Sequence, residues 1–279
     1  MSSSNSGINS RIIPSLLLAY QAGGGDTSRF VVIGGSAAYS WYSALVGNDE
    51  GPVMRTADVD FQVRSGTPKK AIEAFARAVG GEVHWPSYDH HTPEIAKVVV
   101  PYYFGDDAAL EVDFLPCVHG LDRGETFKNA DYVSYTDEKS GREIGYRVIH
   151  PVHVLFNIIE NFLKLQRRDQ ANLARLRAMI PAVRTYIEQQ AVYAAETGEK
   201  SHANDARWSI RVLLRQSDSP DYAGFTLDEG IDLLDAIPGQ DDAPIPGLFW
   251  SEEYPRLLKS VRRRRSRVKV RRANNKTSS

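Results

Sequence analysis

An apolar run that ends in two glycines places the strongest constraint on the fold of this 279-residue chain. Residues 29–33 (Arg-Phe-Val-Val-Ile) are mostly β-branched or aromatic, which is typical of a buried strand, and the run stops at Gly34 and Gly35. Ser36 is a favourable N-cap residue, so we expect a helix over residues 37–46. Strand, glycine turn and helix in this order predict an α/β fold.

Two further strand patterns carry acidic side chains. Residues 58–63 alternate polar and apolar side chains, which places Asp58 and Asp60 on one face of a strand. Alone, this pair fits the exposed face of an edge strand equally well. Residues 110–116 add a third acid, Asp113, on another strand. Three strand-borne acids that follow one glycine turn form a pattern with chemical meaning.

The neighbouring elements follow from periodicity and from Gly and Pro positions. Residues 1–10 are rich in Ser, Asn and Gly, and we expect a disordered leader there. Helices are expected at 16–22 and 68–79, and further strands at 95–104 and 109–115 with a turn at 105–107.

Beyond Pro151 the period becomes helical and predicts a C-terminal α-helical domain. Further helices are expected at 205–215 and at 226–236, where Thr226 and Glu229 have capping-box spacing, with a loop at 244–247. The expected organisation is a leader (1–10), an α/β domain with a mixed sheet (11–148), a helical domain (149–255) and a basic tail (256–279).

The transfer of a nucleotidyl group requires both kinds of residue: acids that bind metal ions and a glycine turn that binds phosphates. Carboxylate oxygens are natural ligands of Mg²⁺, with Mn²⁺ as the alternative, and bound metal ions stabilise both the entering and the leaving oxygen. Backbone N–H groups where a glycine turn enters a helix bind phosphate. Gly34, Gly35 and Ser36 would provide these phosphate-binding groups.

Residues 32–36, 55–61 and 111–115 resemble, in that order, the motifs of the polymerase β nucleotidyltransferase superfamily. In that superfamily an apolar strand leads through Gly-Gly or Gly-Ser to a helix, and Asp-x-Asp and a third acid follow. The Arg-x-x-Asp-x-Asp form and the later helix are most similar to the AbiEii and MenT toxin nucleotidyltransferases. The resemblance covers about residues 12–170.

The resemblance implies roles for individual residues. Asp58 and Asp60 would bind the metal ions, and Asp113 would complete one metal site and help to deprotonate the acceptor hydroxyl. Arg55 would position the acid loop or a phosphate, or it is a surface residue that pairs with Glu50. Lys164 would contact the triphosphate of the NTP, or it is a solvated helix lysine. Asp169 falls near the position of a second helix acid in these toxins. Glu111 is two residues from Asp113 and would join it on the same strand face, or it is a surface acid at the strand start.

Other site types fit the sequence less well. The glycine turn lacks the lysine of a P-loop and the spacing of a dinucleotide fingerprint, and Ala38 replaces the last glycine of a hydrolase elbow. His90 and His91 have no third ligand at zinc spacing, which favours a loop position or a substrate-facing role. His150, His153 and Cys117 are more typical of capping or packing residues, with Cys117 buried.

Charge is divided unevenly along the chain. The formal net charge is -1, from 34 basic and 35 acidic residues, but residues 256–279 contain 11 Lys or Arg and no acid. This tail is a nucleic-acid clamp, a binder of an acidic partner or a solubilising extension, and the first suits an RNA acceptor. The nucleic-acid contacts are expected from Arg262, Arg263, Arg264, Arg265, Arg267, Lys269, Arg271 and Arg272.

The sequence therefore predicts a metal-dependent enzyme that moves an NMP from an NTP to a hydroxyl, most plausibly the tRNA 3′ end, and releases pyrophosphate. A toxin role and an antitoxin partner follow from the resemblance alone. The alternatives are a protein or small-molecule acceptor, or a non-catalytic binding protein on a degenerate scaffold. One cysteine and no apolar run of about 20 residues indicate a soluble, cytoplasmic protein with no membrane partner.

Overall fold

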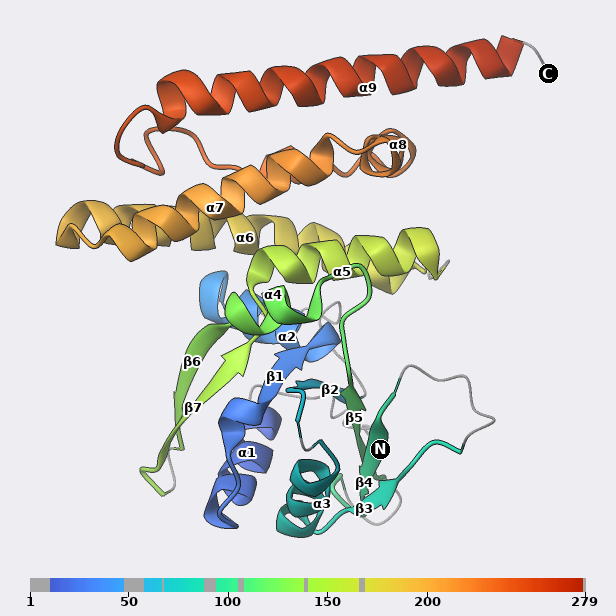
Figure 1. Cartoon of the computed structure of the whole chain (residues 1–279), viewed down its shortest axis with the longest axis vertical. Coiled ribbons are helices and arrows are strands. Elements are labelled where there is room, and N and C mark those ends of the chain that lie inside the picture. The colour runs from blue at the N-terminus through green and yellow to red at the C-terminus, as the bar shows by residue number, and fades with distance from the viewer. Residues whose placement is uncertain are drawn as a thin grey trace, which may run out of the picture. The chain divides into compact units, whose positions relative to one another are not determined.

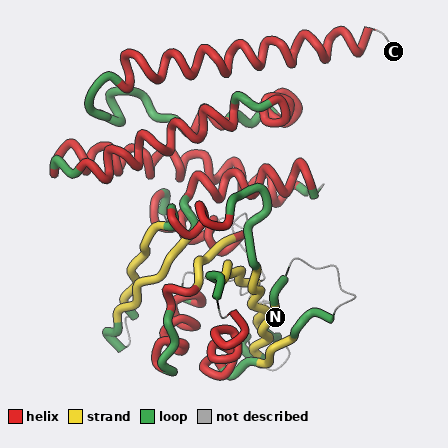
Figure 2. The backbone as a smooth tube through the Cα atoms, viewed as in Figure 1, coloured by secondary structure: helices red, strands yellow, loops and turns green. Residues whose placement is uncertain are grey.

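The computed structural model describes residues 11–47, 58–66, 68–87, 94–104, 108–137, 140–165 and 169–277. The chain forms two compact units, Met1–Asn161 and Phe162–Ser279, which are described separately. All strands of the described residues lie in the first unit, and the second unit is helical (Figures 1 and 2). The expected fold class, α/β with a mixed sheet and a C-terminal helical part, is confirmed.

The first unit is built on a seven-stranded mixed sheet of order β3-β4-β5-β2-β1-β7-β6. The pairs β2/β5 and β1/β7 are parallel, and the other neighbours are antiparallel. The strands are β1 (Phe30–Ile33), β2 (Asp58–Val63), β3 (Glu82–His84), β4 (Ala96–Val100), β5 (Leu110–Leu115), β6 (Asp131–Thr136) and β7 (Glu143–Val148).

An aromatic cluster forms the core on one face of this sheet. Phe30, Phe61 and Phe114 from three adjacent strands pack with Phe75, with ring centroids 5.3 to 5.8 Å apart. Phe61 and Phe114 each follow an acid in the sequence. Because successive side chains of a strand point to opposite faces, the core fixes those acids on the other face. The unit also contains α1 (Ile12–Ala22), α2 (Gly34–Leu45), α3 (Pro68–Val79) and α4 (Arg123–Lys128).

Most elements expected in this unit are confirmed, although the helix expected at 16–22 begins at Ile12, and there are three further differences. Ser36 is not an N-cap: α2 begins at Gly34 and its N-cap is Ile33, because Gly34 takes φ 62° and turns the chain at once. The expected strand at 95–104 ends at Val100, before Pro101 and a turn. The sequence missed β3, β6 and β7, and the turn expected at 105–107 lies outside the described residues.

The second unit is a stack of helices. The helix α5 (Pro151–Lys164) crosses the division between the units, and α6 (Gln170–Thr197), α7 (Lys200–Ser217), α8 (Pro220–Glu229) and α9 (Tyr254–Thr277) follow (Figure 1). A 3-10 turn, Leu233–Ala236, and a π-helical turn, Phe249–Glu253, lie between α8 and α9. No helix in the described part of the chain is both long and apolar enough to span a membrane.

The helix expected at 226–236 is wrong. Ser219, whose hydroxyl accepts from the N–H of Tyr222, and Pro220 at the first turn start α8 earlier, so Thr226 lies in its last turn. Gly230 then ends α8 with φ 65°, in the middle of the expected range. The helix expected at 205–215 lies within the longer α7, and the loop at 244–247 is confirmed. The basic segment forms most of α9.

Candidate metal and nucleotide site

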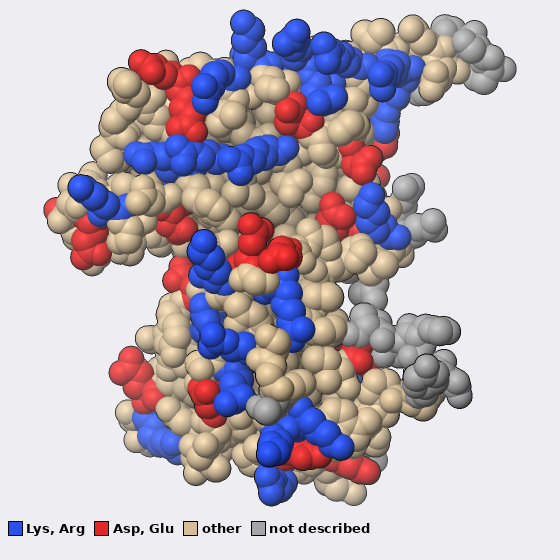
Figure 3. All heavy atoms as spheres, viewed as in Figure 1, with Lys and Arg blue, Asp and Glu red and all other residues tan. Residues whose placement is uncertain are grey.

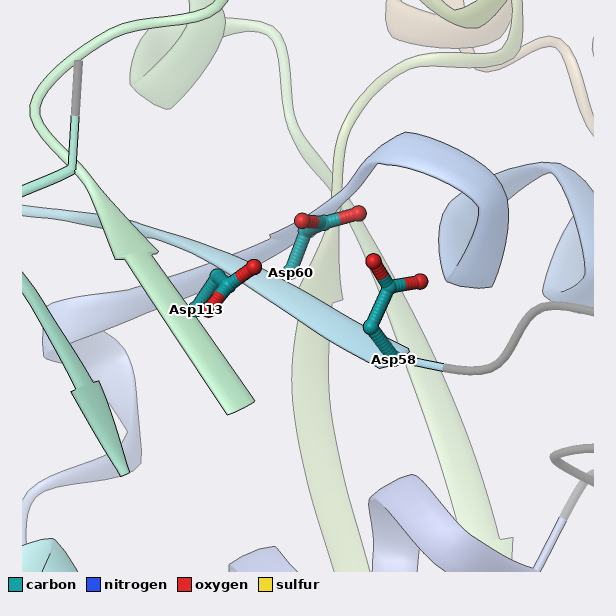
Figure 4. Close-up of side chains that lie close together, drawn as sticks. All are labelled: Asp58, Asp60 and Asp113. Carbon is teal, nitrogen blue, oxygen red and sulfur yellow. The ribbon is translucent and has the colours of Figure 1, made fainter. Parts of the chain in front are cut away.

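Three aspartates from two adjacent strands meet on the face of the sheet opposite the aromatic core. In the parallel pair β2/β5, Asp60 lies directly opposite Asp113, and Asp58 stands two residues earlier on the same face as Asp60. Each carboxylate offers one oxygen within 4.8 Å of the others. Figure 4 shows these carboxylates turned toward a common region. The three expected acids are therefore brought together as one cluster, which we call the acid triad.

Gly34 allows the start of α2 to lie directly against the triad. Its strand neighbour Ile33 pairs with Asp60, and a Cβ added at Gly34 would stand 2.1 Å from Oδ2 of Asp60. A side chain at this position would therefore displace the carboxylate. The first N–H groups of a helix have no partner within the helix, and Ile33 supplies no side-chain cap. An anion-binding helix start thus adjoins the triad.

Ser36 links α2 to the triad strand. The residue is fully buried, and its hydroxyl donates a hydrogen bond of 3.1 Å to the backbone oxygen of Asp58. Further along the helix, Nε1 of Trp41 donates to the oxygen of Ile149 at 2.7 Å. The first bond ties α2 to β2, and the second ties it to the segment that follows β7. The triphosphate contacts expected of Gly35 and Ser36 stay predictions.

Lys97 is a neighbour of the triad that the sequence did not reveal. It lies on β4 opposite Asp113, and its Nζ is 3.5 Å from Oδ1 of Asp113 and 2.6 Å from Oε2 of Glu111. In residues 96–100 (Ala-Lys-Val-Val-Val) a lysine reads as an ordinary solvated strand position. Glu111 forms an ion pair with Lys97 and is therefore not a member of the acid triad.

Burial and neighbouring charges shift the pKa values of Asp113 and Lys97. Burial and the nearby Glu94 carboxylate raise the pKa of Asp113 to about 6, and Asp58 adds to the rise, although Lys97 opposes it. The hydrogen bond with Glu111 raises the pKa of Lys97, so this lysine remains charged. A divalent cation bound at the triad would favour the ionised form of Asp113.

The donor set fits Mg²⁺ or Mn²⁺. All three groups supply hard carboxylate oxygens, and Oδ1 of Asp113 is buried with the Lys97 ammonium at 3.5 Å as its ion-pair partner. With metal–oxygen bonds of about 2.1 Å, two ligands of one ion lie at most about 4.2 Å apart. Oxygens within 4.8 Å of one another therefore need only small side-chain rotations to share an ion.

The remaining residues expected at the site have different positions. Lys164 lies at the end of α5 in the second unit, where its Nζ is 3.2 Å from Oδ2 of Asp221. Asp169 is the N-cap of α6 and accepts from the N–H of Asn172. Cys117 is exposed, which corrects the expected burial. Arg55, its alternative partner Glu50, and His90 and His91 lie outside the described residues.

The basic residues expected to bind nucleic acid divide into two groups. Arg264, Arg265 and Arg272 pair with acids of the second unit. The others are exposed on α9 and form no ion pair with any described residue: Arg262, Arg263, Arg267, Lys269 and Arg271.

Two buried histidines lie at the start of α5, as their packing interpretation expects. His150 and His153 are each 2% exposed, their rings are 6.0 Å apart, and Nδ1 of His150 accepts from the N–H of Val152. Burial, together with the neighbouring His150, lowers the pKa of His153 to about 4. His153 is therefore neutral in the folded protein throughout the physiological range.

This lowered pKa predicts loss of stability in acid. Between pH 6.5 and about 4 the unfolded state binds a proton at His153 that the folded state does not, so stability falls as the pH falls. From pH 7.5 to 4.5 the contribution of His153 to stability is expected to fall by about 2 to 3 kcal/mol, which urea unfolding measures as the difference between wild type and a variant without this histidine.

The contribution of His153 is isolated by comparison of variants. His153→Phe should remove this loss, whereas His84→Gln, at an exposed histidine, should keep it. Asp113 acts in the opposite direction, because its raised pKa favours the folded state in acid, and it is unchanged in both variants. The same pH dependence in wild type and His153→Phe would contradict the prediction.

Comparisons with known proteins leave the family open. No protein-family model and no curated protein matches the chain. A solved structure that it matches is an antigenic nucleotidyltransferase-like protein from Paracoccidioides brasiliensis, with 16% sequence identity, 63% of this chain and 78% of that chain covered, and a TM-score of 0.39. At this TM-score the likeness carries no conclusion about fold or activity.

Proposed function

We propose that the chain is a metal-dependent nucleotidyltransferase that moves an NMP from an NTP to an acceptor hydroxyl and releases pyrophosphate. The observation that carries the proposal is the acid triad beside the start of α2, where Gly34 leaves room for the carboxylate of Asp60. A carboxylate cluster binds metal ions and a helix start binds phosphates. Their juxtaposition suits a substrate that is a metal-bound triphosphate.

Each residue of the site has a part in this reaction. Asp58 and Asp60 hold Mg²⁺ or Mn²⁺, which when bound neutralises the triphosphate and stabilises the entering and leaving oxygens. Asp113 completes the metal site and accepts the proton of the attacking hydroxyl. The first N–H groups of α2, from Gly34, Gly35 and Ser36, bind the phosphates. The acceptor oxygen forms a bond to the α-phosphorus, and the bond from that phosphorus to pyrophosphate breaks.

The acceptor in this proposal is RNA, at the 3′ end of a tRNA. It is supported by the concentration of 11 basic residues after residue 255 in a chain whose remainder has 23 basic and 35 acidic residues. Arg55 and Lys164 are proposed as further triphosphate contacts. A toxin role, with an antitoxin protein as partner, rests on the resemblance to the AbiEii and MenT enzymes.

Label transfer tests the proposal. The protein is incubated with Mg²⁺, each of the four NTPs labelled at the α-phosphate, and total tRNA, and we expect one or more NTPs to label the RNA. Asp58→Ala should lower the rate at least about 100-fold, because a metal ligand is lost. Label on the protein or on a small molecule would identify another acceptor. Absence of transfer to any acceptor, or transfer that Asp58→Ala leaves unchanged, would contradict the proposal.

A further inference from the structure

The basic helix α9 has two faces with different partners. The inward face carries the apolar residues Leu257, Leu258, Val261 and Val268 and the three paired arginines, at helical spacings of three and four residues. Val261 is 1% exposed, so this face belongs to the core of the second unit.

The inward arginines anchor α9 to the rest of that unit. Arg265 forms a bidentate ion pair with Asp232, and Nε of Arg264 donates to the backbone oxygen of Asp218 at 3.1 Å. Arg272 pairs with Asp228, and its guanidinium occupies the space that a side chain at Gly224 would fill, 2.7 Å from a Cβ built there. Because these groups are neutralised within the protein, they are not available to a polyanion.

The outward face presents a row of cations. Arg256, Lys259, Arg263, Arg267 and Arg271 succeed one another at intervals of three or four residues, and all five are exposed. At 1.5 Å per residue the row is about 22 Å long. Arg262 and Lys269 are exposed beside it. Figure 3 shows Lys and Arg side chains gathered over α9 and in a second row over α7.

A cavity lies at the start of this row. It has a volume of about 570 Å³ and is lined by Arg207 and Arg211 of α7, by Arg256 of α9, by residues 246–249 and by the acids Glu252 and Glu253. Arg211 is neutralised by Glu253, at 2.5 and 2.6 Å, whereas Arg256 is exposed. The cavity therefore continues the row of cations onto α7.

We propose that the outward face of α9, together with the arginine-lined cavity at its start, binds the phosphate backbone of a nucleic acid strand. A row of exposed cations about 22 Å long can lie along several successive phosphates of a strand that carries one charge about every 3.4 Å, and guanidinium groups suit phosphate oxygens. Five of the seven outward cations are arginine. A helix that binds a membrane surface buries its apolar face in the bilayer, but the apolar residues of α9 face inward to the second unit, apart from Val270.

Strand binding at this surface does not depend on catalysis, and only the identification of the strand as the acceptor rests on the proposed function. Binding is measured by fluorescence anisotropy with a labelled 20-nucleotide poly(U) RNA and its DNA counterpart, between 50 and 300 mM KCl. If about five cations contact phosphates, log K falls with log salt with a slope of about −3.5, since each contact on a single strand contributes about −0.7.

Paired charge reversals test the location. Arg263→Glu/Arg267→Glu should weaken binding at least about 10-fold at 100 mM KCl and bring the slope to about −2, because two contacts are lost. Lys70→Glu/Arg77→Glu makes the same charge change on exposed residues of α3 and should alter affinity less than about 2-fold. Equal effects of the two pairs would overturn the proposal, given unchanged helix content by circular dichroism.

Competitors identify the partner. Poly(U) should displace the labelled strand, whereas poly-glutamate at the same charge concentration and vesicles with 30% phosphatidylserine should not. Tighter binding of poly-glutamate or vesicles than of RNA, lost in Arg263→Glu/Arg267→Glu, would overturn the nucleic-acid assignment. Binding of poly(U) by Asp58→Ala with wild-type affinity, without label transfer, would support the surface and the catalytic site separately.

Discussion

Asp60→Asn is expected to lower kcat/KM for nucleotidyl transfer about 1,000-fold, equivalent to about 4 kcal/mol of transition-state stabilisation. Asp60 is the central member of the triad, since it lies opposite Asp113, shares its strand with Asp58 and contacts the start of α2. Asparagine preserves the shape of the side chain and removes its charge. Initial rates over a range of NTP concentrations, at saturating Mg²⁺, give kcat/KM and measure the effect.

Two measurements distinguish the loss of a metal ligand from a loss of structure. Mn²⁺ titration followed by electron paramagnetic resonance should show weaker binding by Asp60→Asn, while its thermal unfolding remains cooperative. Glu111→Gln is the matched control, because it removes a neighbouring carboxylate that pairs with Lys97. We expect this variant to keep its activity within about 10-fold. Equal Mn²⁺ affinity in wild type and Asp60→Asn would contradict the role of the triad.

The sequence predicted the members of the triad but not its geometry. Alternation over residues 58–63 and 110–115 places each acid on a strand face, because that pattern is local. The pairing of Asp60 with Asp113, however, depends on β2 and β5 being neighbours, and the 46 residues between these strands do not encode that pairing locally. For the same reason Lys97 was missed: only the β4/β5 pairing brings it to Asp113.

In the second unit, the contacts of the basic residues 256–279 likewise depend on partners far away in the chain. The charge of this segment could be counted from the sequence, whereas the division of that charge into inward and outward residues could not. The inward partners Asp218, Asp228 and Asp232 lie 33 to 46 residues away in the chain. At α8 two local signals competed: Ser219 and Pro220 define the helix start, and the capping-box spacing at Thr226 does not.

Gly34→Ala is expected to lower kcat/KM about 100-fold, although it adds only one methyl group and changes no charge. The new Cβ would stand 2.1 Å from Oδ2 of Asp60, so the carboxylate has to leave its position beside Asp58 and Asp113. The φ of 62° at Gly34 adds about 1 kcal/mol of backbone strain, which lowers stability as well. Activity and Mn²⁺ affinity should therefore fall together.

Gly80→Ala separates the strain from the displaced carboxylate. Gly80 lies in the same unit with φ 70°, and a Cβ there would meet no atom within 4 Å. Both variants should lose a similar amount of unfolding free energy, but Gly80→Ala should keep wild-type kcat/KM and Mn²⁺ affinity. If the two variants retained equal activity, the close approach of α2 to Asp60 would have no part in catalysis. The glycine turn acts in the proposed site through the space that it leaves for one carboxylate, in addition to the chain reversal that first marks it in the sequence.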